Sequence, residues 1–114
     1  MKTLEEMQRD GIDINSAMER FLNNEEMYRS FLRRLPDENT YDNMLEAVRK
    51  KDVSYAFDEA HKLKGILGNL ALTEAYNILF NIVECLRRGE LPEDSELSGF
   101  ISVYEKWIAY IKDM

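Results

Sequence analysis

The chain contains few of the residues that shape loops and cross-links. Its 114 residues include one cysteine, two prolines and five glycines. A single cysteine, Cys85, excludes a disulfide within the chain and is expected to be a small buried hydrophobic residue. So few prolines and glycines argue against a loop-rich or β-sandwich fold, and no stretch shows the sustained period-two alternation of a strand. The sequence therefore predicts an all-α fold.

Two further absences narrow the range of partners. No apolar run approaches the ~20 residues of a membrane span, and residues 1–7 lack the apolar core of a signal peptide. We therefore expect a cytoplasmic protein. Positive charge is also scarce, because the formal net charge is −7. A nucleic acid requires a basic surface, so neither a nucleic acid nor an anionic membrane is an expected partner.

Hydrophobic residues make up 45% of the chain, which is enough for a core in one domain over residues 1–114. Gly11 is expected to end a short helix, and Asp13 to cap a second one. The expected caps of the helices that follow are Asn23, Thr40, Asp52 and Thr73. Short links between amphipathic helices favour an antiparallel up-down four-helix bundle over residues 23–114. Residues 1–22 would form one or two short helices that cover one end.

The only histidine, His61, has an unusual helical setting. At 100° per residue, one side of the helix that follows Asp52 is apolar. That side carries Ala56, Ala60, Leu63, Leu67 and Leu70. His61 lies roughly 140° from its centre, so we expect an exposed imidazole. Its neighbours on that face are Phe57, Lys64, Gly65 and Gly68.

These neighbours favour a functional histidine over an inert one, although a lone histidine is more often inert. Neutral imidazole is a competent nucleophile near pH 7, and Lys64 is placed to neutralise a phosphoryl group on it. Gly65 and Gly68 each cost roughly 1 kcal/mol inside a helix, so they are expected to leave room for another protein. Phe57 is either the rim of the core or an apolar contact for that partner.

Other chemistries have little support in the sequence. One histidine and one cysteine on different helices do not make a metal site, and the pair of Glu-x-x-His elements that a di-iron site needs is absent, since Glu59 is two residues before His61. A Cys85–His61 dyad is not expected, because the two side chains point to opposite sides of their helices. No glycine-rich loop could hold a nucleotide phosphate. We therefore expect no metal and no cofactor.

The segment Ala60-His61-Lys62-Leu63-Lys64-Gly65, followed by Gly68, resembles the signature of histidine-containing phosphotransfer (HPt) domains. Residues 72–76 and the basic stop at 87–89 are also similar, whereas Ala71 stands where a glycine is common. The resemblance implies that His61 accepts a phosphoryl group from a receiver-domain aspartate and returns it to another receiver. Lys64 would steady the phosphoryl charge, and Gly65 and Gly68 would leave space for the receiver.

The same resemblance implies a stand-alone carrier rather than an enzyme, because the metal and most catalytic groups belong to the receiver. The expected partners are receiver domains and, indirectly, a sensor histidine kinase, and the carrier is expected to be a monomer. One alternative stays open, namely a helical interaction module that docks a partner without being phosphorylated. The joint presence of His61, Lys64, Gly65 and Gly68 favours the carrier.

Overall fold

The computed structural model describes all 114 residues and contains seven α-helices, one 3-10 helix and no strand. The elements are α1 (Leu4–Arg9), α2 (Ile14–Arg20), α3 (Glu25–Arg34), η1 (Leu35–Asp37), α4 (Thr40–Arg49), α5 (Val53–Asn69), α6 (Thr73–Arg87) and α7 (Asp94–Lys112). The all-α prediction is confirmed. None of these helices has the length and apolar character that a membrane span requires.

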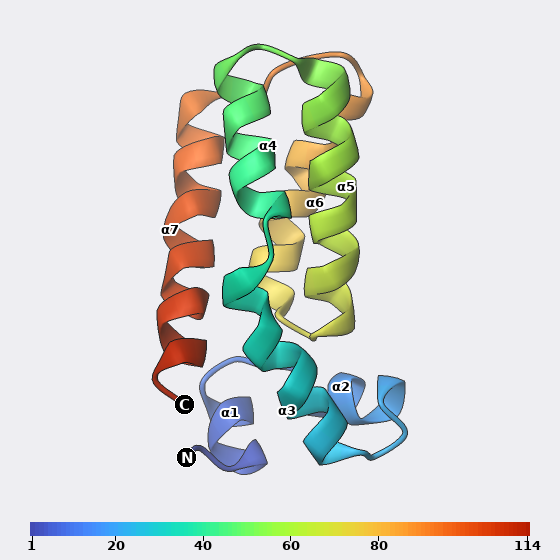
Figure 1. Cartoon of the computed structure of the whole chain (residues 1–114), viewed down its shortest axis with the longest axis vertical. Coiled ribbons are helices and arrows are strands. Elements are labelled where there is room, and N and C mark those ends of the chain that lie inside the picture. Colours follow the sequence, from blue (N-terminus) through green and yellow to red (C-terminus); the bar gives the residue numbers. More distant parts are fainter.

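Four columns of helix run alternately up and down (Figure 1). Three of them are the continuous helices α5, α6 and α7. The first column is broken, because the 3-10 helix η1 lies between α3 and α4. Both α3 and η1 contact α7, whereas α4 packs against α5. Short turns join successive columns, as expected for antiparallel neighbours. The predicted up-down bundle is therefore confirmed, with a break at Pro36 in its first column.

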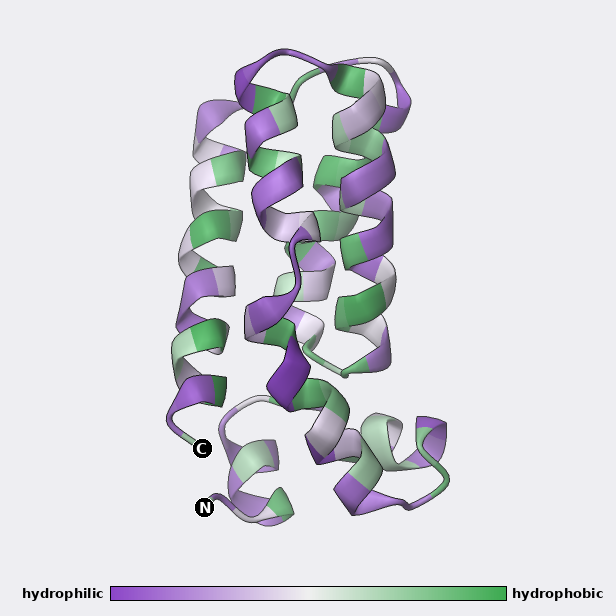
Figure 2. Cartoon of the chain, viewed as in Figure 1, coloured by the Kyte–Doolittle hydropathy of each residue, from purple (hydrophilic) through white to green (hydrophobic).

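Apolar side chains of every column meet in one core, and hydrophobic and hydrophilic segments alternate along the bundle helices (Figure 2). Between α4 and α7 the rings of Tyr41 and Tyr104 stack with centroids 4.0 Å apart. Across the base of the bundle, the buried Tyr28 hydroxyl of α3 donates a hydrogen bond to the Leu70 carbonyl oxygen at 2.8 Å. These contacts tie the broken column to the continuous ones.

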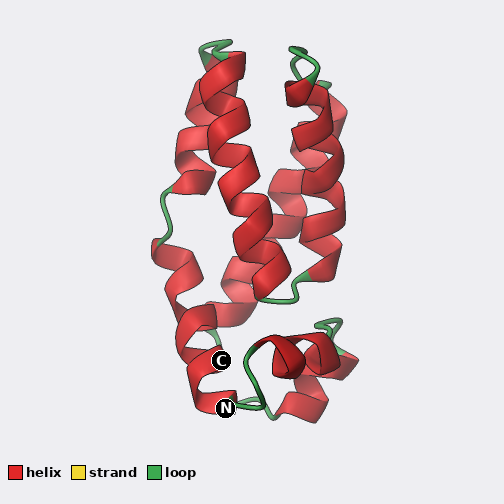
Figure 3. Cartoon of the chain, turned by 90° about the vertical axis from the view of Figure 1, so that its right-hand side faces the viewer, coloured by secondary structure: helices red, strands yellow, loops and turns green.

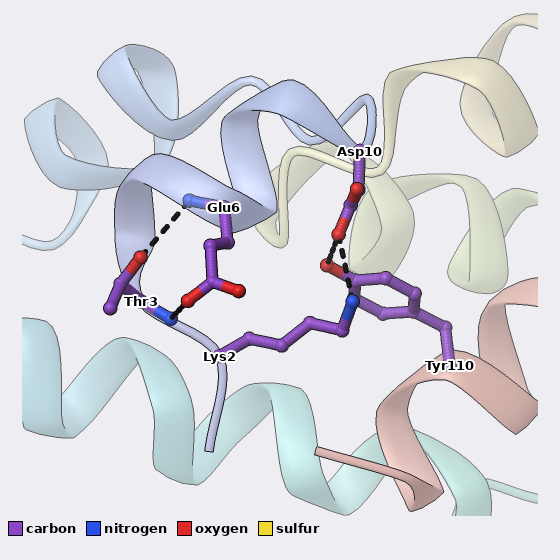
Figure 4. A network of polar contacts seen from close by, with 5 residues as sticks. All are labelled: Lys2, Thr3, Glu6, Asp10 and Tyr110. Atoms are coloured by element: carbon purple, nitrogen blue, oxygen red, sulfur yellow. Dashed lines mark hydrogen bonds and ion pairs between the residues drawn. The ribbon is translucent and has the colours of Figure 1, made fainter.

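The short helices α1 and α2 lie at the lower end of the bundle (Figures 1 and 3), and α1 is the one near the C-terminus. A capping box starts α1: Thr3 and Glu6 exchange backbone-to-side-chain hydrogen bonds of 3.1 Å each (Figure 4). After α1, the Asp10 carboxylate accepts a hydrogen bond of 2.6 Å from the Tyr110 hydroxyl and one of 3.0 Å from Lys2. The Tyr110 and Lys2 contacts lower the pKa of Asp10. The N-terminal segment is thereby fastened to α7.

Two of the five predicted helix caps are confirmed, and the other three caps lie one residue away from the predicted positions. Asp13 and Asp52 each accept a hydrogen bond from the backbone N–H three residues on. Asn23 was expected to cap α3, but that prediction is wrong, since Asn24 accepts the equivalent bond. The reason is the backbone at Asn23, whose φ of 62° is left-handed and does not lead into a helix.

The predictions that Thr40 and Thr73 are caps are also wrong. Both are first residues of their helices, and the cap positions belong to Asn39 and Leu72, which make no side-chain capping bond. Neither threonine hydroxyl is free to cap its helix. Thr40 is buried, and the Thr73 hydroxyl donates a hydrogen bond back to the Ala71 carbonyl oxygen at 3.5 Å.

Candidate functional site

His61 lies in the middle of α5, with its imidazole exposed. The apolar side of the same helix faces the core, where all of its predicted members are buried. These are Ala56, Ala60, Leu63, Leu67 and Leu70. Helical periodicity predicts that His61 points outward, and this prediction is confirmed. The residues on the opposite side of α5, which recur every three or four positions, are buried in the core.

Phe57 lies one helical turn before His61 and is half-buried. The Phe57 and imidazole rings are nearly parallel, with 6° between their planes and 5.6 Å between their centroids. On α6, the guanidinium carbon of Arg87 lies 4.9 Å from the Phe57 ring centroid. Phe57 therefore contacts both the histidine ring and a cation that comes from the neighbouring helix.

The two lysines near His61 have different surroundings. Lys62 forms an ion pair of 2.9 Å with Glu59, which raises the pKa of Lys62. Lys64 forms no ion pair, and its ammonium nitrogen lies 5.0 Å from the ring centroid of Phe80 on α6. Lys64 is therefore the lysine on this face whose charge is not already paired with a carboxylate.

Glu59 is a buried carboxylate two residues before His61, and only 3% of it is exposed. It accepts a hydrogen bond of 2.8 Å from the Asn43 side chain, on α4, and a longer one of 3.4 Å from the Tyr55 hydroxyl. Contacts with Lys62 and then Asn43 hold the pKa of Glu59 below its usual value. A buried charge requires such partners, so Glu59 is a structural link between α4 and α5.

Gly65 and Gly68 differ in the space around them. A Cβ atom added to Gly65 would meet no atom within 4 Å, so the expected open space exists there. A Cβ added to Gly68 would lie 3.2 Å from Cε2 of Tyr76 on α6. The expectation of open space at Gly68 is wrong, because the Tyr76 ring fills it. Gly68 lets α5 and α6 pack closely.

Two residues of α6 next to this face were missed by the sequence reasoning. The predicted site did not include Phe80, and Arg87 belongs to the basic stop at residues 87–89. The structure places Phe80 beside Lys64 and Arg87 beside Phe57. One sequence signal was available, because Phe80 follows the aromatic Tyr76 by one helical turn. The Phe80 side chain is 41% exposed in the structure.

His61 does not line any of the five main cavities. One cavity, with a volume of about 650 Å³, lies between α2, α3 and the lower end of α5. Its apolar lining comes from Phe21, Phe31, Leu35, Ile66 and Leu70. A histidine on an open face meets a reaction partner carried by another macromolecule more readily than a small molecule held in a pocket.

No cluster of three or more His, Cys, Asp or Glu side chains is arranged to hold a metal ion. Cys85 is buried on α6, and its thiol donates a weak hydrogen bond to the Glu90 carbonyl oxygen at 3.5 Å. Burial raises the pKa of the Cys85 thiol, so the reactive thiolate is disfavoured. The predicted role of Cys85 as a buried hydrophobic residue agrees with this position.

The chain is similar to one described family of protein domains. A family model described as Hpt domain matches residues 26–113, which begin in α3 and extend just past the end of α7. No curated protein and no solved structure matches the chain. The matched range includes the whole bundle and His61, and leaves out α1 and α2.

Proposed function

The chain belongs to the Hpt domain family, whose members are phosphorelay carriers of two-component signalling, and we propose that His61 is its phosphoacceptor. The observation that supports this most is the exposed imidazole of the only histidine, in the middle of a helix whose other side is buried. Domains of this family carry phosphoryl groups rather than act as classical enzymes. We expect the exchange to take place in the cytoplasm, where domains of this family generally work.

The proposed step is a reversible transfer between a receiver aspartate and His61. The unprotonated nitrogen of neutral imidazole attacks the phosphorus of an aspartyl phosphate, so that an N–P bond forms while the P–O bond to the carboxylate breaks. The aspartate leaves as a carboxylate, and no proton has to be removed from the attacking nitrogen. The reverse step delivers the group to the aspartate of a second receiver.

The neighbours of His61 have distinct proposed roles in this step. Lys64 has no competing carboxylate, so its ammonium can move from the Phe80 ring to a phosphoryl oxygen. Gly65 has no side chain beside the imidazole, so a receiver can approach the ring closely on that side. Phe57 and Gly68 also lie on the face where we propose that the receiver docks, although Gly68 in addition serves helix packing.

The proposal is tested with a receiver domain charged by acetyl phosphate. When the phosphorylated receiver is mixed with the wild-type chain, the phosphoryl group should move from the receiver to the chain. A second, unphosphorylated receiver added afterwards should then take the phosphoryl group from the chain. Binding of the receiver without any transfer would instead support the alternative, an interaction module that is not phosphorylated. Absence of both binding and transfer with a panel of receivers would contradict both readings.

A further inference from the structure

We propose that Phe57 is a positioning residue for His61, and that Arg87 holds Phe57 in place from α6. The inference about orientation stands on geometry alone. Its consequence for phosphotransfer rests on the function proposed above. The family signature that begins at Ala60 does not include Phe57, so this contact belongs to this chain's own surface.

The geometry of the two rings is that of an offset stack. Their planes differ by 6° and their centroids lie 5.6 Å apart, within the range in which aromatic pairs attract each other. The last side-chain torsion of a histidine is broad, so an exposed imidazole would otherwise rotate over a wide range. Stacking on a ring one helical turn away removes most of that freedom, because only the present orientation and its 180° flip keep the two planes parallel.

Phe57 can restrain its neighbour only if it is restrained itself. Its ring is half-buried and packs against the core, and the Arg87 guanidinium carbon lies 4.9 Å from the ring centroid. Arg87 is itself ion-paired with Glu84 one turn earlier on α6, at 3.4 Å. The chain of contacts thus runs from Glu84 through Arg87 and Phe57 to the imidazole, from one helix to the next.

Orientation matters because the lone pair of the attacking nitrogen lies in the plane of the imidazole ring. In-line transfer requires that plane to point at phosphorus, and an imidazole held in advance loses less freedom on reaching that geometry. Phe57 therefore acts through His61 and need not touch the receiver. This distinguishes a positioning role from the docking role, in which loss of Phe57 would weaken receiver binding.

The experiment compares three variants: Phe57→Leu, which removes the aromatic ring, Phe57→Tyr, which keeps it, and Phe80→Leu as a matched control. Phe80 lies on the same surface but contacts Lys64. Because His61 is the only histidine, its imidazole C–H signals in an NMR spectrum need no assignment among several. We expect nuclear Overhauser contacts to the Phe57 ring, and imidazole shifts that change in Phe57→Leu but not in Phe57→Tyr or Phe80→Leu.

In the complex saturated with phosphorylated receiver, Phe57→Leu should slow the transfer step about threefold to tenfold, and Phe57→Tyr should restore the rate. Absence of nuclear Overhauser contacts between the imidazole and the Phe57 ring would show that the two rings do not stack. A weakened affinity with an unchanged rate in the saturated complex would overturn positioning and leave docking. If wild type takes no phosphoryl group, the proposed function fails, whereas the NMR comparison still decides whether Phe57 orients His61.

Discussion

Alanine substitutions at Gly65 and Gly68 compare the stability effect of a new methyl group at two positions of α5. Position 65 is open, whereas position 68 packs against α6. At Gly65 the new methyl group meets nothing within 4 Å, so the full helix-propensity gain of about 1 kcal/mol is expected. In a domain of this size that gain raises the melting temperature by about 4 °C. At Gly68 the methyl group lies 3.2 Å from one Tyr76 ring carbon and 3.3 Å from another, closer than ordinary contact.

Overpacking of this kind costs about 1–3 kcal/mol, which offsets or exceeds the propensity gain. The unfolding free energy of Gly65→Ala should therefore exceed that of Gly68→Ala by about 1–3 kcal/mol. Urea denaturation followed by circular dichroism measures both. In a Tyr76→Ala background the penalty at position 68 should disappear. Equal stabilities of the two alanine variants, or a penalty that survives loss of the Tyr76 ring, would refute the packing argument.

Glutamate at position 65 extends the same reasoning to function. Gly65→Glu should keep or raise stability, since glutamate is a good helix former and the site is open. Its side chain would stand on the surface where we propose that a receiver docks, and its charge would face the acidic phosphoacceptor pocket. Transfer to His61 should slow while the melting temperature holds. An unchanged transfer rate would remove Gly65 from the docking face.

Three further predictions concern single side chains. Lys64→Ala should shorten the lifetime of phosphorylated His61 in a decay assay, yet change the unfolding free energy by less than about 1 kcal/mol, since it loses only one cation–π contact. Glu59→Gln should destabilise the fold by about 1–3 kcal/mol at pH 7. Because the folded-state pKa of Glu59 is lowered, that difference should shrink in urea titrations as the pH falls below about 4. Tyr110→Phe should raise the pKa of Asp10 toward its ordinary value, as followed by the carboxyl carbon signal in an NMR titration.

Much of the fold could be predicted from the sequence because it depends on local periodicity. The apolar residues at positions 56, 60, 63, 67 and 70 recur at helical spacing, and this alone turns His61 outward. The caps Asp13 and Asp52 are local as well, since each side chain bonds a backbone group three residues on. Thr40 and Thr73 show the limit of such reasoning, since each is the first residue of its helix and the cap position falls one residue earlier.

The contacts between helices could not be predicted from the sequence. That Gly68 faces the Tyr76 ring depends on how closely α5 and α6 approach each other, which no spacing along α5 reveals. The same holds for Arg87 over Phe57, which are 30 positions apart in the sequence. The residue types near His61 could thus be predicted from one helix, whereas their arrangement needs both.

The most direct test of the account is the fate of the phosphoryl group on the wild-type chain and on His61→Gln. Both proteins are incubated with the same charged receiver and analysed for bound phosphate. We expect a label on wild type that is labile in acid and stable in alkali, as an N–P bond is, and no such label on the variant. An acid-labile label retained by His61→Gln, or an alkali-labile label on wild type, would contradict the assignment of His61 as the phosphoacceptor.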